Sequence, residues 1–308
     1  MPHFLHDFFL FGFKQARACA FAVCFFSLLF LSRHLPLFGL YRYDFLCLAA
    51  IAVQALFLWT GLETWREALV LCLFHALGLG LELFKTHPAI GSWAYPEDGV
   101  LKLGWVPLYS GFMYAAVASY MCQAWPLLAL RLERYPSYRF TIPLAVLIYA
   151  NFFTHHWLPD VRWLLIAAVL LVFRRTRVYY HPGASPRMMP LALSFVLIGF
   201  FVWIAENVST YLGAWVYPSQ RAGWNLVSAH IFSSWSLLVI VSFIIVAELK
   251  HVREGETPRA EESLVVPLHS GRLPDQLGDL RPPRRPHVLD HHVALGLARP
   301  TEQPPRVG

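Results

Sequence analysis

Two glutamates occur in the same short motif, each at the end of an apolar segment. Residues 82–96 read Glu-x-x-x-Thr, a spacer and then Gly-Ser-Trp-Ala-Tyr-Pro; residues 206–218 read Glu-x-x-x-Thr, a spacer and then Gly-Ala-Trp-Val-Tyr-Pro. A carboxyl group at the edge of an apolar helix is costly to ionise and usually serves a function. Burial favours its neutral form, which suits it to general acid–base chemistry. We therefore predict that Glu82 and Glu206 are catalytic.

Histidines and asparagines lie near the ends of the same apolar segments. His75 precedes Glu82 by seven residues, so the two share a helix face. We expect these groups to converge with the repeated aromatic residues in one polar pocket, because polar groups in lipid must face one another or water. The predicted catalytic residues are Glu82, Glu206, His155 and His156, and the predicted substrate-binding residues are His75, Trp93, Tyr95, Asn151, Asn207, Trp215, Tyr217 and His230.

Each candidate also has a structural interpretation. The glutamates could pair with Lys85 and Arg221 at the membrane interface, and the histidines could be packing or interfacial residues. The tryptophans match an aromatic belt at the interface. Because Trp and Tyr recur in the same context, we favour a pocket lined by aromatic rings, which suits an apolar or polyene ligand.

The composition is that of a membrane protein. Hydrophobic residues form 57% of the chain and charged residues 14%, unlike a soluble globular domain. Eight apolar runs are predicted to cross the membrane. They cover residues 18–32, 45–61, 68–84, 106–130, 140–157, 161–173, 189–205 and 226–249.

Arginine placement predicts the topology. Residues 131–139 and 174–187 are rich in arginine, and the loops between them in the sequence are poorer in basic residues. The positive-inside rule then places both termini in the cytoplasm and both motifs outside, in the cytoplasmic (inner) membrane. We expect residues 1–249 to form the membrane domain and residues 250–308, which lack apolar periodicity, to be a disordered tail.

The repeated motif predicts two equivalent halves. Four crossings separate the copies, so they share one orientation and form parallel repeats. The expected fold is all-α: a polytopic membrane helix bundle of about eight transmembrane helices in two parallel four-helix repeats.

Several short sequence segments resemble those of the YoaT-like family of bacterial integral membrane proteins. They are found in residues 40–45, 82–97, 107–116, 151–156 and 203–207. This resemblance implies a multi-pass membrane protein and no particular activity. The Glu-then-Gly-aromatic-Tyr-Pro arrangement is also similar to membrane-bound carotenoid hydratases and heterodimer-type lycopene cyclases, which implies chemistry on an isoprenoid.

The leading functional prediction is a membrane-embedded enzyme in which the two glutamates perform acid–base chemistry on an isoprenoid or other lipid. Such chemistry requires no cofactor. A variant binds zinc or iron through Glu82, Glu206, His75, His155 and His156, although their spacing fits no standard motif. A proton-coupled transporter and a non-catalytic membrane subunit are the alternatives. We attribute the excess of basic residues to the positive-inside rule and expect no nucleic-acid binding. The sequence leaves the oligomeric state open.

Overall fold

The computed structural model describes residues 2–183 and 185–254. They belong to a compact unit that spans Met1–Pro258. The last helix continues to Glu254, past the predicted boundary at residue 249. The predicted disordered tail therefore lies, from residue 255 onward, outside the described residues.

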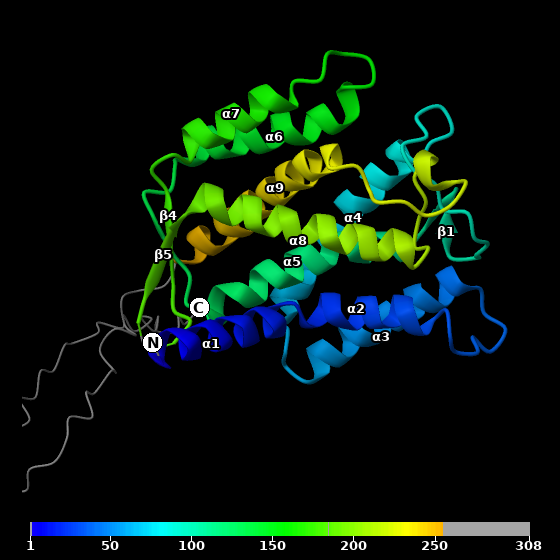
Figure 1. The fold of residues 1–308 in the computed structure, drawn as a ribbon, viewed down its shortest axis with the longest axis horizontal. Coiled ribbons are helices and arrows are strands. Elements are labelled where there is room, and N and C mark those ends of the chain that lie inside the picture. Colours follow the sequence, from blue (N-terminus) through cyan, green and yellow to red (C-terminus); the bar gives the residue numbers. More distant parts are fainter. Residues whose placement is uncertain (1, 184, 255–308) are drawn as a thin grey trace, which may run out of the picture. The chain divides into compact units, whose positions relative to one another are not determined.

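The described residues are mostly helical (Figure 1). Their α-helices are α1 (Pro2–Ala18), α2 (Ala20–Leu31), α3 (Arg42–Trp59), α4 (Trp65–Lys85), α5 (Ser110–Leu127), α6 (Tyr138–Thr154), α7 (Arg162–Val172), α8 (Leu191–Tyr211) and α9 (His230–Glu254). A 3₁₀ turn covers Pro218–Gln220.

The helices that carry the glutamates each pack against the next helix in the chain. Helix α4 packs along α5, and α8 packs along α9. At the start of α4, the Thr64 hydroxyl accepts a hydrogen bond from the Glu67 backbone, and the Glu67 carboxylate accepts one from the Thr64 backbone. This capping box fixes where α4 begins. Each motif loop then connects the two helices of its pair.

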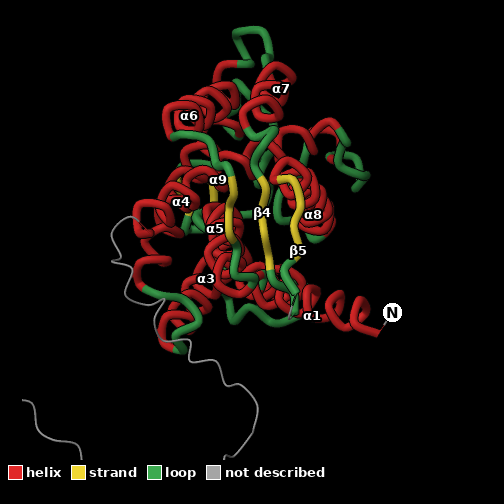
Figure 2. The backbone as a smooth tube through the Cα atoms, turned by 90° about the vertical axis from the view of Figure 1, so that its left-hand side faces the viewer, coloured by secondary structure: helices red, strands yellow, loops and turns green. Residues whose placement is uncertain are grey.

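Two small antiparallel sheets correct the all-α expectation. One pairs β1 (Lys102–Leu103) with β2 (Val106–Pro107). The other has β4 (Arg177–Tyr180) between β3 (Arg131–Glu133) and β5 (Arg187–Pro190), and Figure 2 shows β4 beside β5. The three strands of this second sheet come from the two arginine-rich loops. Their pairing joins segments far apart in the chain, which local hydrophobic periodicity does not reveal.

Four helical segments are long and apolar enough to cross a membrane alone: Arg42–Trp59, Trp65–Lys85, Leu191–Tyr211 and His230–Glu248. The pair Leu5–Ala18 and Ala20–Leu31, bent by 66°, makes a fifth if it counts as one broken span. Helix α7 has 11 residues, about 17 Å at the helical rise, which is short of a hydrocarbon core of about 30 Å. The described fold is mostly helical, with four to five helical segments whose length and composition are those of membrane spans.

Large apolar side chains cover the outer helix surfaces. Leu164 and Leu171 on α7 and Phe140 on α6 are each more than 60% exposed. Continuous apolar surface of this kind indicates contact with lipid or another protein. The buried core lies mainly between α5, α6, α8 and α9, and a second cluster joins α2 and α3 to the motif loops.

Candidate functional site

Glu82 lies in the last turn of α4 and is 2% exposed. Its Oε2 accepts hydrogen bonds from Trp93 Nε1 at 2.7 Å and from the Tyr95 hydroxyl at 2.8 Å. Its Oε1 accepts a third from the Tyr114 hydroxyl of α5 at 2.9 Å. Both carboxyl oxygens are therefore occupied by donors from the protein.

Gly78 makes room for Tyr114. A Cβ atom at position 78 would lie 2.4 Å from the Tyr114 ring, whereas one at Gly80 would meet nothing within 4 Å. Gly78 therefore permits close packing of α4 against α5 and lets the tyrosine of α5 reach the glutamate one turn further along α4.

Glu206, near the end of α8, is 3% exposed and has a less complete set of donors. Its Oε1 accepts hydrogen bonds from Trp215 Nε1 at 3.1 Å and from the Tyr217 hydroxyl at 2.5 Å. Its Oε2 accepts none from the residues that the structure describes. The Trp235 indole of α9 acts on Glu206 as a weak hydrogen-bond donor, although its buried Nε1 lies outside standard hydrogen-bond geometry. Glu206 Oε2 therefore lacks a hydrogen bond of standard geometry from the described residues, and the donor beside the carboxyl group, Trp235, interacts with it weakly.

The repeated motif explains how each loop reaches its glutamate. Gly91 and Gly213 have φ values of +60° and +66°, which glycine adopts without steric cost. They turn the chain back after each helix. In the extended segment that follows, residues two apart face the same side, so the Trp and the Tyr of one copy both reach the same carboxyl group.

The two motif copies pair with each other. Ala94, between Trp93 and Tyr95, exchanges two backbone hydrogen bonds of 2.9 Å with Val216, which holds the same place in the second copy. The Trp93 and Tyr217 rings lie 6.1 Å apart, and the charge of Glu82 acts on both Glu206 and Tyr217. The two glutamates thus belong to one site.

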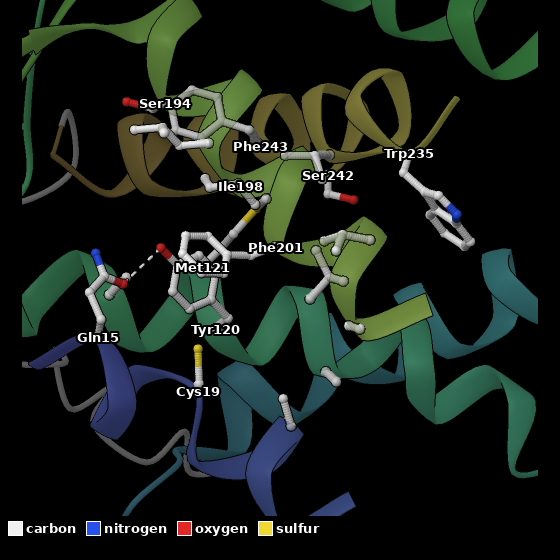
Figure 3. A pocket seen from close by; sticks show the side chains of 18 of the residues that line it. Gln15, Cys19, Tyr120, Met121, Ser194, Ile198, Phe201, Trp235, Ser242 and Phe243 are labelled. Carbon is white, nitrogen blue, oxygen red and sulfur yellow. Dashed lines mark hydrogen bonds between the residues drawn. The ribbon is translucent and has the colours of Figure 1, made fainter. Parts of the chain in front are cut away.

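This site closes one end of a large apolar cavity of about 720 Å³. Its walls come from α1, α2, α5, α8 and α9, and Figure 3 shows Trp235 far from Gln15 and Tyr120 in this cavity. Along α5 the lining runs from Met113 to Leu128, about 22 Å at 1.5 Å per residue. The cavity is therefore elongated, with the carboxyl groups and their Trp and Tyr partners among its lining.

Tyr95 and Tyr217 lie outside the candidate spans. Burial, together with the Glu82 charge, raises the pKa of Tyr95, and burial with the Glu206 charge raises the pKa of Tyr217. Both phenols therefore stay protonated and donate hydrogen bonds at neutral pH.

The two predicted catalytic histidines join a second polar group, centred on Lys85. Lys85 Nζ lies 3.3 Å from His155 Nε2 and 3.0 Å from His156 Nε2. His155 Nδ1 lies 2.7 Å from the Asn151 carbonyl. Burial, reinforced by the charges of Lys85 and His155, lowers the pKa of His156 to about 4.

Asn151 and His230 also belong to this second group. The Asn151 side chain donates to Asp160 at 3.2 Å, and Asp160 pairs with Arg162 Nε at 2.5 Å. Arg162 Nη1 lies 3.1 Å from His230 Nδ1. No hydrogen bond between described side chains links this group to the glutamate site, so the structure divides the expected single polar pocket in two.

His75 and Asn207 have other surroundings. The His75 ring contacts Phe112 edge to face at 4.6 Å, on a face of α4 that packs against Gly111. The Asn207 side chain donates to the Trp203 carbonyl and accepts from the Val227 backbone N–H, both at 2.8 Å. Asn207 therefore ties α8 to the loop before α9.

Within the described ranges, no three His, Cys, Asp or Glu side chains are grouped as metal ligands. Sequence reasoning missed Tyr114 and Trp235 at the first site and the roles of Lys85 and Arg162 at the second. Their signals were weak: each is a single polar residue in or beside an apolar segment.

Comparison with known proteins places the chain in a family. Residues 7–243 match the family described as "Protein of unknown function (DUF817)". "Uncharacterized protein YoaT" of Bacillus subtilis (strain 168) is 52% identical over 251 residues, which cover 82% of this chain and 94% of that protein. No solved structure matches the chain. The chain therefore belongs to the DUF817 family, as its resemblance to YoaT-like proteins predicted.

Proposed function

We propose that this protein is a membrane-embedded enzyme that performs proton chemistry on an isoprenoid or other lipid with an elongated apolar chain. The observation that carries the proposal is the apolar cavity of about 720 Å³ whose lining includes both buried glutamates. Ligand pockets are typically apolar with a few placed polar groups. Here those polar groups can exchange protons.

Glu206 is the residue that we assign to proton transfer. Its Oε2 is open, whereas Glu82 has donors on both oxygens. The three hydrogen-bond donors at Glu82 stabilise negative charge there more than the two at Glu206 do. Two carboxyl groups that interact in an apolar site favour holding one proton between them. Glu206 would hold this proton, and Glu82 would be the neighbouring negative charge.

The chemistry that fits is addition of a proton to a carbon–carbon double bond. Glu206 Oε2 transfers its proton to one alkene carbon, and the adjacent carbon becomes a cation. The faces of Trp93, Trp215 and Trp235 can stabilise this cation, as can the Glu82 carboxylate. Return of a proton from a neighbouring carbon to Glu206 completes an isomerisation or cyclisation. Addition of water to the cation, with loss of one water proton to Glu206, completes a hydration. No redox step is needed.

The eight-span topology with two parallel repeats is part of this proposal. The antiparallel bridge between Ala94 and Val216 supports it, because a two-fold axis along the membrane normal makes equivalent in-plane segments antiparallel. The glutamates then lie on the outer side of the inner membrane, and both termini are cytoplasmic. Reporter fusions after Ser137 should be cytoplasmic and fusions within 208–223 external; a cytoplasmic 208–223 loop would overturn the parallel repeat.

The experiment is lipid profiling of a deletion strain complemented with variants. Wild-type protein should convert a lipid that accumulates in the deletion strain, and Glu206→Gln should fail to do so while it inserts normally. Glu248→Gln is the matched control, because Glu248, on α9, is likewise a glutamate at the end of a candidate membrane span but pairs with Thr141 outside the cavity. Full complementation by Glu206→Gln would reject the proposed acid–base role.

A further inference from the structure

We propose that Lys85 and Arg162 form a second ligand site, which binds a phosphate group. The site lies where four helix ends meet: the C-terminal ends of α4 and α6 and the N-terminal ends of α7 and α9. It is separate from the glutamate cavity, and none of its charged groups lines that cavity.

Lys85 is a buried cation without a carboxylate partner. Lys85 is only 5% exposed. No carboxylate of a described residue lies within 4.0 Å of its ammonium group. His155 Nδ1 must donate to the Asn151 carbonyl, so its Nε2 is an acceptor for Lys85. The ammonium group has three donors, and His155 and His156 use two of them. The third is open to a ligand.

Arg162 also has an open donor. Its Nε is paired with Asp160, and its Nη1 lies near His230, Ser233 and Ser234. Nη2 has no hydrogen-bond partner among the described residues and is not sealed from solvent. Arg162 is 8% exposed, so the guanidinium is fixed in place. The open Nη2 of this fixed guanidinium can donate charge-assisted hydrogen bonds to a phosphate oxygen.

The charge balance calls for an anion. Two buried cations, Lys85 and Arg162, act on each other, and among the described residues Asp160 is the carboxylate that acts on both. A buried charge without a counter-ion is destabilising. The Asp160 carboxylate already accepts a hydrogen bond from the Arg162 backbone N–H at the start of α7 and pairs with the Arg162 side chain, so it does not also offset the charge of Lys85 in full. A phosphate group would supply the missing negative charge.

This site belongs to one half of the protein. Lys85 is the third residue after Glu82, and the equivalent residue after Glu206 is Ser209. The basic group is therefore not needed to build the repeated Glu–Trp–Tyr arrangement. A separate ligand explains why a lysine is buried at this position and a serine at the other.

The test measures phosphate binding to the full-length protein in nanodiscs made of phosphatidylcholine. In one arm inorganic phosphate is titrated, with chloride at equal ionic strength as the reference. In the other arm phosphatidic acid is added to the nanodiscs. Thermal stability and the ³¹P signal report binding, and the imidazole signals of His156 report the pKa, which should rise when an anion offsets Lys85. Saturable binding in the first arm identifies a soluble phosphate, and binding in the second alone identifies a lipid head group.

Lys85→Met and Arg162→Gln should each weaken binding roughly tenfold or more, as loss of a charge-assisted partner does. Arg221→Gln is the control, because Arg221 is an exposed loop arginine and its loss removes the same charge. The wild-type titration remains decisive if a variant fails to fold. Absence of saturable binding in both arms would overturn the proposal, as would Lys85→Met and Arg162→Gln binding like wild type.

Discussion

Tyr114 and Trp235 occupy corresponding places beside the two glutamates, and only Tyr114 completes its hydrogen bond. The Tyr114 hydroxyl donates to Glu82 at 2.9 Å, whereas the Trp235 indole N–H interacts with Glu206 only weakly, outside standard hydrogen-bond geometry. Their rings lie 6.3 Å apart. The two halves therefore share a plan but differ at one donor, and this difference leaves Glu206 open to a ligand.

Trp235→Phe tests this difference against Trp93→Phe. Removing a buried donor that interacts only weakly costs little, so Trp235→Phe should keep or slightly raise the melting temperature while it weakens ligand retention. Trp93→Phe removes a real hydrogen bond to Glu82 and should destabilise by about 1–3 kcal/mol. Thermal melting and bound-lipid analysis of both variants provide the measurements. Equal destabilisation would contradict the weak interaction of Trp235.

Gly78→Ala should displace the Tyr114 ring and break its bond to Glu82, because the added Cβ would lie 2.4 Å from that ring. Overpacking of this kind costs about 1–3 kcal/mol. Gly80→Ala is the matched control: it makes the same change on the same helix, with nothing within 4 Å, and should stabilise through helix propensity. Melting temperatures of the two variants that move in the same direction would contradict the proposed packing.

Acidification should destabilise the group around Lys85. The folded pKa of His156 is about 4 because burial and the charges of Lys85 and His155 disfavour its protonation, while Asp160 and Arg162 act on the adjacent His155. The ordinary value is about 6.5. Between these values the unfolded chain binds more protons, so stability is complete above about pH 6.5 and falls as the pH drops toward about 4.

His156→Gln should reduce this acid sensitivity, and His34→Gln, at an exposed position in the loop after α2, should not. Melting temperatures across this pH range test the prediction. A wild-type melting temperature that is unchanged between about pH 6.5 and pH 4.5 would contradict it.

The sequence identified the two glutamates and their motif partners, but it did not identify the contacts that these residues make with neighbouring helices. The Glu-then-Trp-x-Tyr motif identified both glutamates, and period-two spacing in an extended segment explains why Trp93 and Tyr95 reach the same carboxyl group. The donors Tyr114 and Trp235 come from neighbouring helices, so only packing reveals them. The separation of His155 from Glu82 likewise depends on how α6 is placed against α4, which residue spacing along either helix does not specify.

The central claim is that the cavity binds a lipid whose reactive group reaches Glu206. Mass spectrometry of lipids extracted from purified protein tests it most directly. Wild-type protein should carry a lipid with an elongated apolar chain, Glu206→Gln should carry its unconverted precursor, and Ala205→Phe, which fills the cavity wall beside Glu206, should carry little of either. Ala52→Phe on exposed α3 surface should match wild type. Equal lipid content in wild type and Ala205→Phe, or the same lipid in wild type and Glu206→Gln, would contradict the account.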